Sequence, residues 1–99
     1  MDSDKSYICE NNITLIKNLL SVILVDDESF AIANLSKLIE TYCPSLKIVS
    51  TASNVLLAEQ RINYFKPDVV FLDINMPNLN GFELLDRLID IPLVVFVTA

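Results

Sequence analysis

Residues 68–77 read DVVFLDINMP, and this stretch decides the fold. Its run of four apolar residues, two of them β-branched, predicts a strand buried on both faces, as in a parallel sheet, and Asp73 stands where the strand ends. Two further apolar runs end in the same way. Residues 22–25 lead to Asp26 and Asp27, and residues 93–97 lead to Thr98. Because ligands bind beyond the carboxyl ends of strands in open parallel sheets, we expect three carboxylates and a hydroxyl at one edge.

Segments with helical periodicity separate the predicted strands, which we place at residues 21–25, 46–51, 68–72 and 93–98. Ser29 is expected to cap a helix that Pro44 ends, and Asn54 a second helix that ends at Lys66 and Pro67. A third helix is expected over residues 81–89. The expected inward positions are Ile32, Leu35, Leu38, Ile39 and Tyr42, then Val55, Ala58, Ile62 and Phe65, then Leu84, Leu85 and Leu88.

The alternation of strands and helices predicts right-handed crossovers and a parallel sheet in an α/β domain. We assign residues 1–20 to an N-terminal extension and residues 21–99 to the domain itself. A chain of 99 residues suits one domain, and an apolar content of 53% is enough to build its core.

The charge and composition exclude several classes of function. A net charge of −6 disfavours direct binding of nucleic acid, which needs clustered lysine and arginine. Cys9 and Cys43 form no motif and the chain has no histidine, so neither a zinc site nor a disulfide is expected. Polar residues interrupt the apolar stretch 13–25, which is therefore not a membrane span. We expect a cytoplasmic protein.

The three aspartates suggest a divalent cation. Asp26, Asp27 and Asp73 would repel one another if they met without one, and Mg²⁺ prefers such oxygen ligands. The alternative at residues 26–28 is that the acidic residues only begin a helix, where they favour its dipole.

Taken together, these motifs resemble those of the receiver domain of two-component response regulators. The chain reads VDDE at residues 25–28, DINMPNLNG at 73–81 and VTA at 97–99. The resemblance runs from Val22 to the last residue. It implies a flavodoxin-like, three-layer α/β fold with parallel strand order 2-1-3-4.

The resemblance also implies a role for each site residue. Asp73 would accept a phosphoryl group from the phosphohistidine of a sensor histidine kinase. Asp27 would bind Mg²⁺ directly, Asp26 largely through water or by positioning, and the backbone carbonyl of Asn75 would be a further ligand. Thr98 would hydrogen-bond the phosphoryl group as the switch step. Such a protein is a signalling phospho-acceptor and not an enzyme acting on a free metabolite.

The short interval between two of these residues is similar to that of LytTR-type receivers, because Thr98 follows Asp73 by only 25 residues. In that subfamily the receiver precedes a DNA-binding output domain. A haloacid-dehalogenase-type phosphatase is disfavoured, since that family places Asp-x-Asp after its first strand.

The chain departs from the full receiver pattern at its end. A full receiver continues with a fourth helix, a fifth strand ending in Lys-Pro and a fifth helix, whereas this sequence stops at Ala99 and has no lysine after Lys66. We therefore expect either a fragment or a chain that self-associates through the open edge of the strand at 93–98. The alternative function is a truncated, switch-incompetent receiver that acts only through protein association.

Overall fold

The computed structural model describes residues 19–76 and 81–97. Its elements are β1 (Leu20–Val25), α2 (Ser29–Tyr42), β2 (Leu46–Ala52), α3 (Val55–Phe65), β3 (Val69–Asp73), α4 (Gly81–Asp86) and β4 (Leu93–Val97). The strands form one sheet in the order β2-β1-β3-β4, and every neighbouring pair is parallel. The predicted α/β fold and strand order 2-1-3-4 are confirmed.

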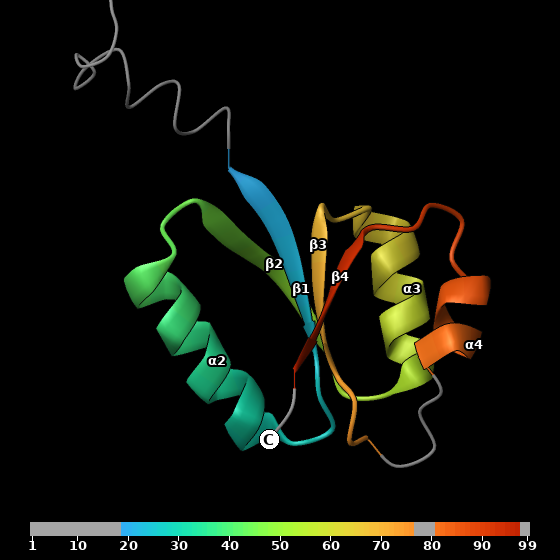
Figure 1. Cartoon of the computed structure of the whole chain (residues 1–99), viewed down its shortest axis with the longest axis horizontal. Coiled ribbons are helices and arrows are strands. Elements are labelled where there is room, and N and C mark those ends of the chain that lie inside the picture. Colours follow the sequence, from blue (N-terminus) through green and yellow to red (C-terminus); the bar gives the residue numbers. More distant parts are fainter. Residues whose placement is uncertain (1–18, 77–80, 98–99) are drawn as a thin grey trace, which may run out of the picture.

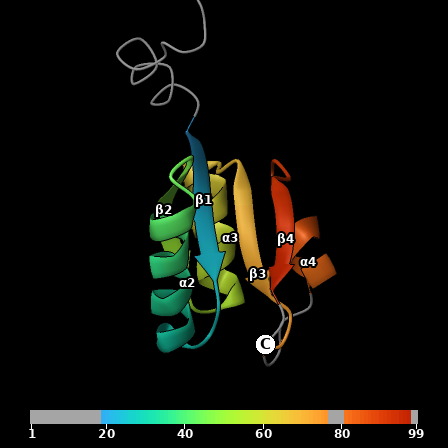
Figure 2. The same ribbon diagram turned by 60° about the vertical axis from the view of Figure 1, so that its left-hand side comes forward.

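The sheet lies between two helical layers. Figure 1 shows α2 on one side of the sheet and α3 and α4 on the other. Figure 2 shows β4 at one edge of the sheet, with α2 at the opposite end of the row of strands. No described helix is both long and apolar enough to cross a bilayer.

Two apolar clusters form the core, one on each face of the sheet. Alternate residues of the strands point to opposite faces, so one run of apolar residues serves both clusters. The cluster under α3 and α4 contains Ile23, Val25, Ala52, Ala58, Ile62, Val70, Leu72, Met76, Leu84 and Leu88. The cluster under α2 is smaller and contains Val22, Leu24, Ile39 and Val69.

Hydrogen bonds at the amino ends of the strands connect β1 to β4. The carboxylate of Asp68 accepts bonds from the backbone N–H and the hydroxyl of Ser21, at 2.8 and 3.1 Å. The N–H of Asp68 donates to the carbonyl of Ser21 at 3.0 Å, and the N–H of Leu93 donates to the carbonyl of Asp68 at 3.1 Å. Residue 68 thus fixes the starts of β1 and β4 relative to each other.

The ends of the helices confirm one predicted cap and correct two other expectations. Asn54 caps α3, since its side chain accepts from the N–H of Leu57 at 2.9 Å. Ser29 does not cap α2: the cap position is Glu28, which has extended backbone and no side-chain cap bond, and Ser29 is already helical.

The helix α4 ends at Asp86 and does not continue to residue 89. The N–H groups of Arg87 and Leu88 donate to carbonyls only three residues back, which tightens the last turn. The N–H of Ile89 then donates to the side chain of Asn63 on α3 at 3.0 Å, so a tertiary bond replaces the next helical one.

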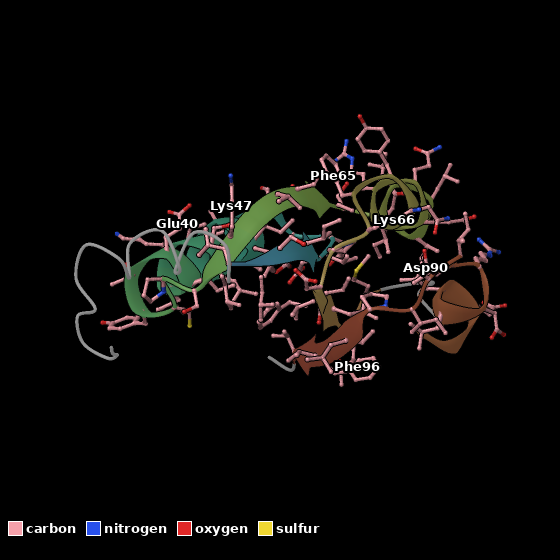
Figure 3. The ribbon with its side chains drawn as sticks, turned by 90° about the horizontal axis from the view of Figure 1, so that it is seen from above. Glu40, Lys47, Phe65, Lys66, Asp90 and Phe96 are labelled. Atoms are coloured by element: carbon pink, nitrogen blue, oxygen red, sulfur yellow. The ribbon has the colours of Figure 1, made fainter. Side chains whose placement is uncertain are left out.

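Three predicted core positions are exposed. Leu38 and Tyr42 on α2 are 53% and 75% exposed, because the buried contacts of this helix come from a narrower stripe around Ile39. Phe65, at the end of α3, is 42% exposed and packs edge-to-face on Tyr64 with ring centroids 4.9 Å apart. Figure 3 shows Phe65 at this end of the helix.

Candidate metal centre

Two neighbouring strands bring the aspartates to one edge of the sheet. β1 pairs with β3 in parallel, and Val25 lies opposite Leu72. The next residue on each strand, Asp26 and Asp73, therefore lies beyond this last pair at the carboxyl edge. Strand length and register place these two side chains together, although they are far apart in the sequence.

Local hydrogen bonds orient both carboxylates. The N–H of Glu28 donates to Oδ1 of Asp26 at 3.0 Å, and the N–H of Asn75 donates to Oδ1 of Asp73 at 2.9 Å. Each aspartate thus bonds the backbone two residues further on, which is a common way for aspartate to start a turn. The chain turns away after each strand, and the carboxylates stay at the edge.

The side chains of Asp26, Asp27 and Asp73 form one acidic cluster. Each can offer a carboxylate oxygen such that these atoms all lie within 4.8 Å of one another. Asp26 and Asp73 are half-buried, and Asp27 is exposed. The predicted convergence of the three aspartates is confirmed. A mere helix start would not explain why Asp73, from another strand, joins the pair.

The cluster carries an excess of negative charge. Burial raises the pKa of the Asp26 carboxyl, and the nearby charges of Asp73 and Asp27 raise it further, against the opposing effect of the Glu28 N–H. Two ion pairs in the described part of the chain lie elsewhere, between Lys66 and Asp90 and between Arg87 and Glu59. A bound cation would therefore relieve repulsion within the cluster.

The donor atoms of the cluster suit a hard cation. Asp26 and Asp27 after β1 and Asp73 at the end of β3 can each offer Mg²⁺ a carboxylate oxygen. Because Asp27 is exposed, water and a phosphoryl group can occupy the remaining positions around the ion. No sulfur or imidazole donor belongs to this group. The residues present thus fit a hard cation such as Mg²⁺ better than a soft transition-metal ion.

Replacing Asp26 with asparagine is expected to stabilise the metal-free domain at pH values above the raised pKa of Asp26. Because the pKa of Asp26 is raised, the folded protein binds more protons than the unfolded chain between the two pKa values, and wild-type stability falls as pH rises through this window. The side-chain oxygen of asparagine can still accept the hydrogen bond from the Glu28 N–H. Because asparagine carries no charge, the variant does not lose stability as the pH rises. The gain should stay below about 1 kcal/mol, because half-exposed charges are screened.

Urea unfolding in Mg²⁺-free buffer at several pH values measures this difference. The excess in free energy of unfolding of the variant over the wild type should grow as the pH rises through the pKa of Asp26 and then stay constant. A variant that becomes less stable than the wild type as pH rises would contradict the expectation.

The other predicted site residues have different outcomes. Asn75 lies two residues after Asp73 and is exposed, and its N–H donates to the carboxylate of Asp73. The role of its carbonyl as a metal ligand stays a prediction. Thr98 lies outside the described residues, so its predicted place beside the cluster is untested.

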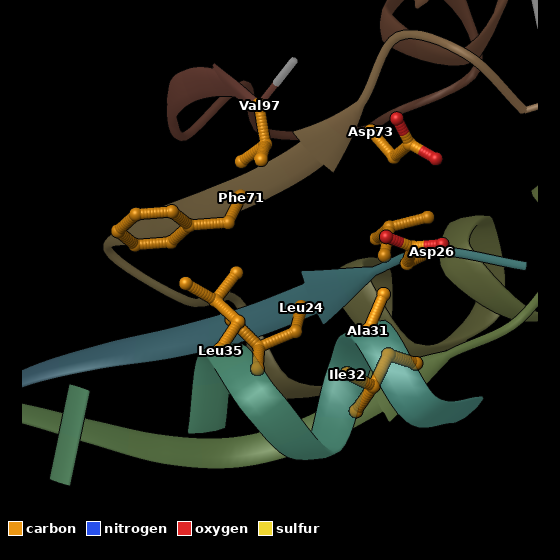
Figure 4. A pocket seen from close by; sticks show the side chains of 9 residues that line it. Leu24, Asp26, Ala31, Ile32, Leu35, Phe71, Asp73 and Val97 are labelled. Atoms are coloured by element: carbon orange, nitrogen blue, oxygen red, sulfur yellow. The ribbon is translucent and has the colours of Figure 1, made fainter. Parts of the chain in front are cut away.

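A small pocket adjoins the cluster, and the sequence pattern does not predict it. Asp26 and Asp73 line one end, and the rest of the lining is apolar (Figure 4). The apolar residues are Leu24, Val25, Ala31, Ile32, Leu35, Phe71 and Val97. The helical spacing of Ile32 and Leu35 predicts only that these side chains face the core, and it does not indicate that they also line a pocket. Low-polarity surroundings strengthen electrostatic interactions at the carboxylates.

Comparison with known sequences gives one consistent result. Residues 22–99 match the model of the response regulator receiver domain. An uncharacterized response regulatory protein of Vibrio cholerae is 42% identical over 88 residues, which are 86% of this chain and 34% of that protein. Another from Yersinia pestis is 46% identical over 84 residues, 82% of this chain and 34% of that protein. The chain spans about a third of the length of these relatives.

Solved structures agree with the sequence matches. The response regulator domain of Thermotoga maritima CheB has a TM-score of 0.69 and 36% identity, and the match covers 81% of this chain and 60% of that one. A structure of the P1 domain of CheA3 in complex with CheY6 from R. sphaeroides gives a TM-score of 0.69 at 26% identity, covering 80% and 63%.

Proposed function

Because the chain belongs to the family of response regulator receiver domains, we propose that it accepts a phosphoryl group on Asp73 with the help of Mg²⁺. The observation that supports this most is the convergence of Asp26, Asp27 and Asp73, whose carboxylate oxygens come within 4.8 Å of one another. A receiver needs both a nucleophilic carboxylate and a cation site, and this cluster can supply the two together.

In the proposed reaction, one carboxylate oxygen of Asp73 attacks the phosphorus of a phosphohistidine. The P–N bond breaks, the imidazole leaves with its electron pair, and an acyl phosphate forms on Asp73. Asp26, Asp27, the second oxygen of Asp73 and the Asn75 carbonyl would hold Mg²⁺, which when bound neutralises charge on the phosphoryl oxygens. The protein contributes position and electrostatics, and it transforms no free metabolite.

The donor in this proposal is a sensor histidine kinase in the cytoplasm. The similarity to the structure of CheY6 with the P1 domain of CheA3 supports a kinase domain as the partner. After transfer, the hydroxyl of Thr98 would bond a phosphoryl oxygen and draw its own segment inward, which is the switch step.

We further assign the receiver to the LytTR type. The connection from α4 to β4 is short, since only residues 87–92 separate the two elements. On this assignment a DNA-binding output domain would lie in a part of the protein beyond this chain, and the receiver itself would contact no nucleic acid.

Incubation with acetyl phosphate and Mg²⁺ tests the central proposal. Intact-protein mass spectrometry should detect the addition of one phosphoryl group, and chelation of Mg²⁺ should prevent it. Asp73→Asn should abolish the addition, because the amide is not a nucleophile at this site. Asp86→Asn is the matched control: it removes an exposed aspartate from the end of α4 and should leave the addition unchanged.

The absence of any addition to the wild-type chain would contradict the proposal, as would equal addition to Asp73→Asn. The first result would favour the alternative of a receiver that acts only by protein association. In that case a second copy would pair with the edge of β4, where Leu93, Val95 and Phe96 are exposed.

A further inference from the structure

The chain leaves β3 through two exposed residues, which a buried one follows. Ile74 is 47% exposed and Asn75 is exposed as well, whereas Met76 is only 6% exposed. Met76 belongs to the core cluster under α3 and α4, to which α3 contributes Ala58 and Ile62. The side chain of Met76 therefore anchors in the core the segment that follows the acidic cluster.

The backbone of this segment is held at three successive positions. The N–H of Ile74 donates to the carbonyl of Val97 on β4 at 3.2 Å. The N–H of Asn75 donates to Oδ1 of Asp73 at 2.9 Å. The third restraint is of another kind, because Met76 is held by the burial of its side chain. The exposed side chains of Ile74 and Asn75 face water and do not provide such an anchor.

The carbonyl of Asn75 lies between the last two of these restraints. This carbonyl and the backbone nitrogen of Met76 belong to one peptide group, which is planar and rotates as a unit. The hydrogen bond to Asp73 holds the chain before the group, and the buried side chain of Met76 holds the chain after it. The direction of the Asn75 carbonyl therefore depends on where Met76 is anchored.

We propose that Met76 is a positioning residue for the metal centre, and that its buried side chain fixes the peptide group that carries the Asn75 carbonyl. The inference rests on the proposed function, in which this carbonyl holds Mg²⁺ together with the three carboxylates. The buried thioether of Met76 is a soft donor and does not itself bind such a hard ion. Residues that orient metal ligands in this way change metal affinity by about 10- to 100-fold when they are replaced.

Leu88 separates positioning from packing. It belongs to the same core cluster and is 9% exposed, which is close to the 6% of Met76. It lies beyond the end of α4, and no proposed ligand adjoins it in the sequence. Truncation of either side chain removes buried apolar atoms and should lower the stability of the domain. Only truncation of Met76 should also release a peptide group beside the acidic cluster.

Calorimetric titration of the 99-residue chain with Mg²⁺ alone tests the proposal. Met76→Ala should raise the dissociation constant about tenfold. Met76→Leu keeps a buried side chain of similar volume and should stay within about twofold of the wild type. Leu88→Ala should stay within about the same twofold range, although it also loses core packing. Circular dichroism at the titration temperature verifies that each variant is folded.

The carbonyl carbon of Asn75 gives a second readout, which a loss of stability alone would not change. Saturation with Mg²⁺ should shift its NMR signal in the wild type and in Met76→Leu, and by more than the carbonyl signal of Ile74. The shift should be smaller in Met76→Ala, even at saturation. If Met76→Ala does not fold, Met76→Val takes its place, with an intermediate rise in the dissociation constant.

The outcomes distinguish this inference from the proposed function. If the wild type binds Mg²⁺, a dissociation constant that is unchanged in the truncated Met76 variant, or raised equally in Leu88→Ala, overturns the inference alone. A carbonyl signal of Asn75 that does not respond to bound Mg²⁺ in the wild type overturns it as well. A wild-type chain that binds no Mg²⁺ overturns both the inference and the proposed function.

Discussion

Replacing Leu72 with alanine is expected to lower the free energy of unfolding by about 3 kcal/mol, within the range for buried leucines. Leu72 is 1% exposed in the middle of β3 and belongs to the larger core cluster, which it shares with Ile23 and Val70. Neighbouring strands hold the backbone on both sides, so the cavity cannot close by a local shift. A small domain has little stability to spare, and a sizeable unfolded population should appear on warming.

Urea unfolding followed by circular dichroism measures the loss. Leu56→Ala is the matched control, because Leu56 is 62% exposed on α3 and the same atoms are removed there. Its effect should stay within about 0.5 kcal/mol. Equal losses for the two variants would contradict the assignment of the core to this face of the sheet.

Mg²⁺ is expected to stabilise the wild-type domain by about 2.7 kcal/mol when its concentration is a hundred times the dissociation constant. The cation would bind the folded cluster, where three carboxylates meet, and it would have no equivalent site in the unfolded chain. Asp27→Asn should remove most of this gain. Asp27 is exposed, so the substitution should cost little stability in metal-free buffer.

Paired urea titrations with Mg²⁺ and with a chelator give the stabilisation for each variant. Asp86→Asn has the same change of charge at an exposed position outside the cluster and should keep the whole Mg²⁺ effect. If both variants respond to Mg²⁺ as the wild type does, the cluster is not the binding site. If neither the wild type nor the control responds, the domain does not bind the ion at all.

The strands were the most predictable part of the fold. Each buried strand is a continuous apolar run that ends in a polar residue, and this pattern depends little on distant contacts. The start of α3 was equally predictable from the sequence, because the side chain of Asn54 accepts a hydrogen bond from the backbone of its own helix. The three aspartates could be assigned to one edge because parallel strands end on the same side of a sheet.

Helix ends and exposure were less predictable. The end of α4 depends on Asn63 of another helix, which takes the N–H of Ile89. Leu38, Tyr42 and Phe65 have helical spacing like their buried neighbours, yet they are exposed because the described layers leave their side of the helix uncovered. Periodicity shows which residues share a stripe, but packing decides how wide a stripe is buried.

The order of residues by itself determined the strands, their parallel arrangement and the identity of the acidic residues at their ends, since these follow from local patterns of apolar and polar side chains. Only the tertiary structure decided how closely the carboxylates of Asp26, Asp27 and Asp73 approach and that an apolar pocket adjoins them. It also decided that Leu38, Tyr42 and Phe65 are exposed. Distances, shared electrostatic fields and exposed surface depend on segments remote in sequence, and these come together only when the sheet assembles.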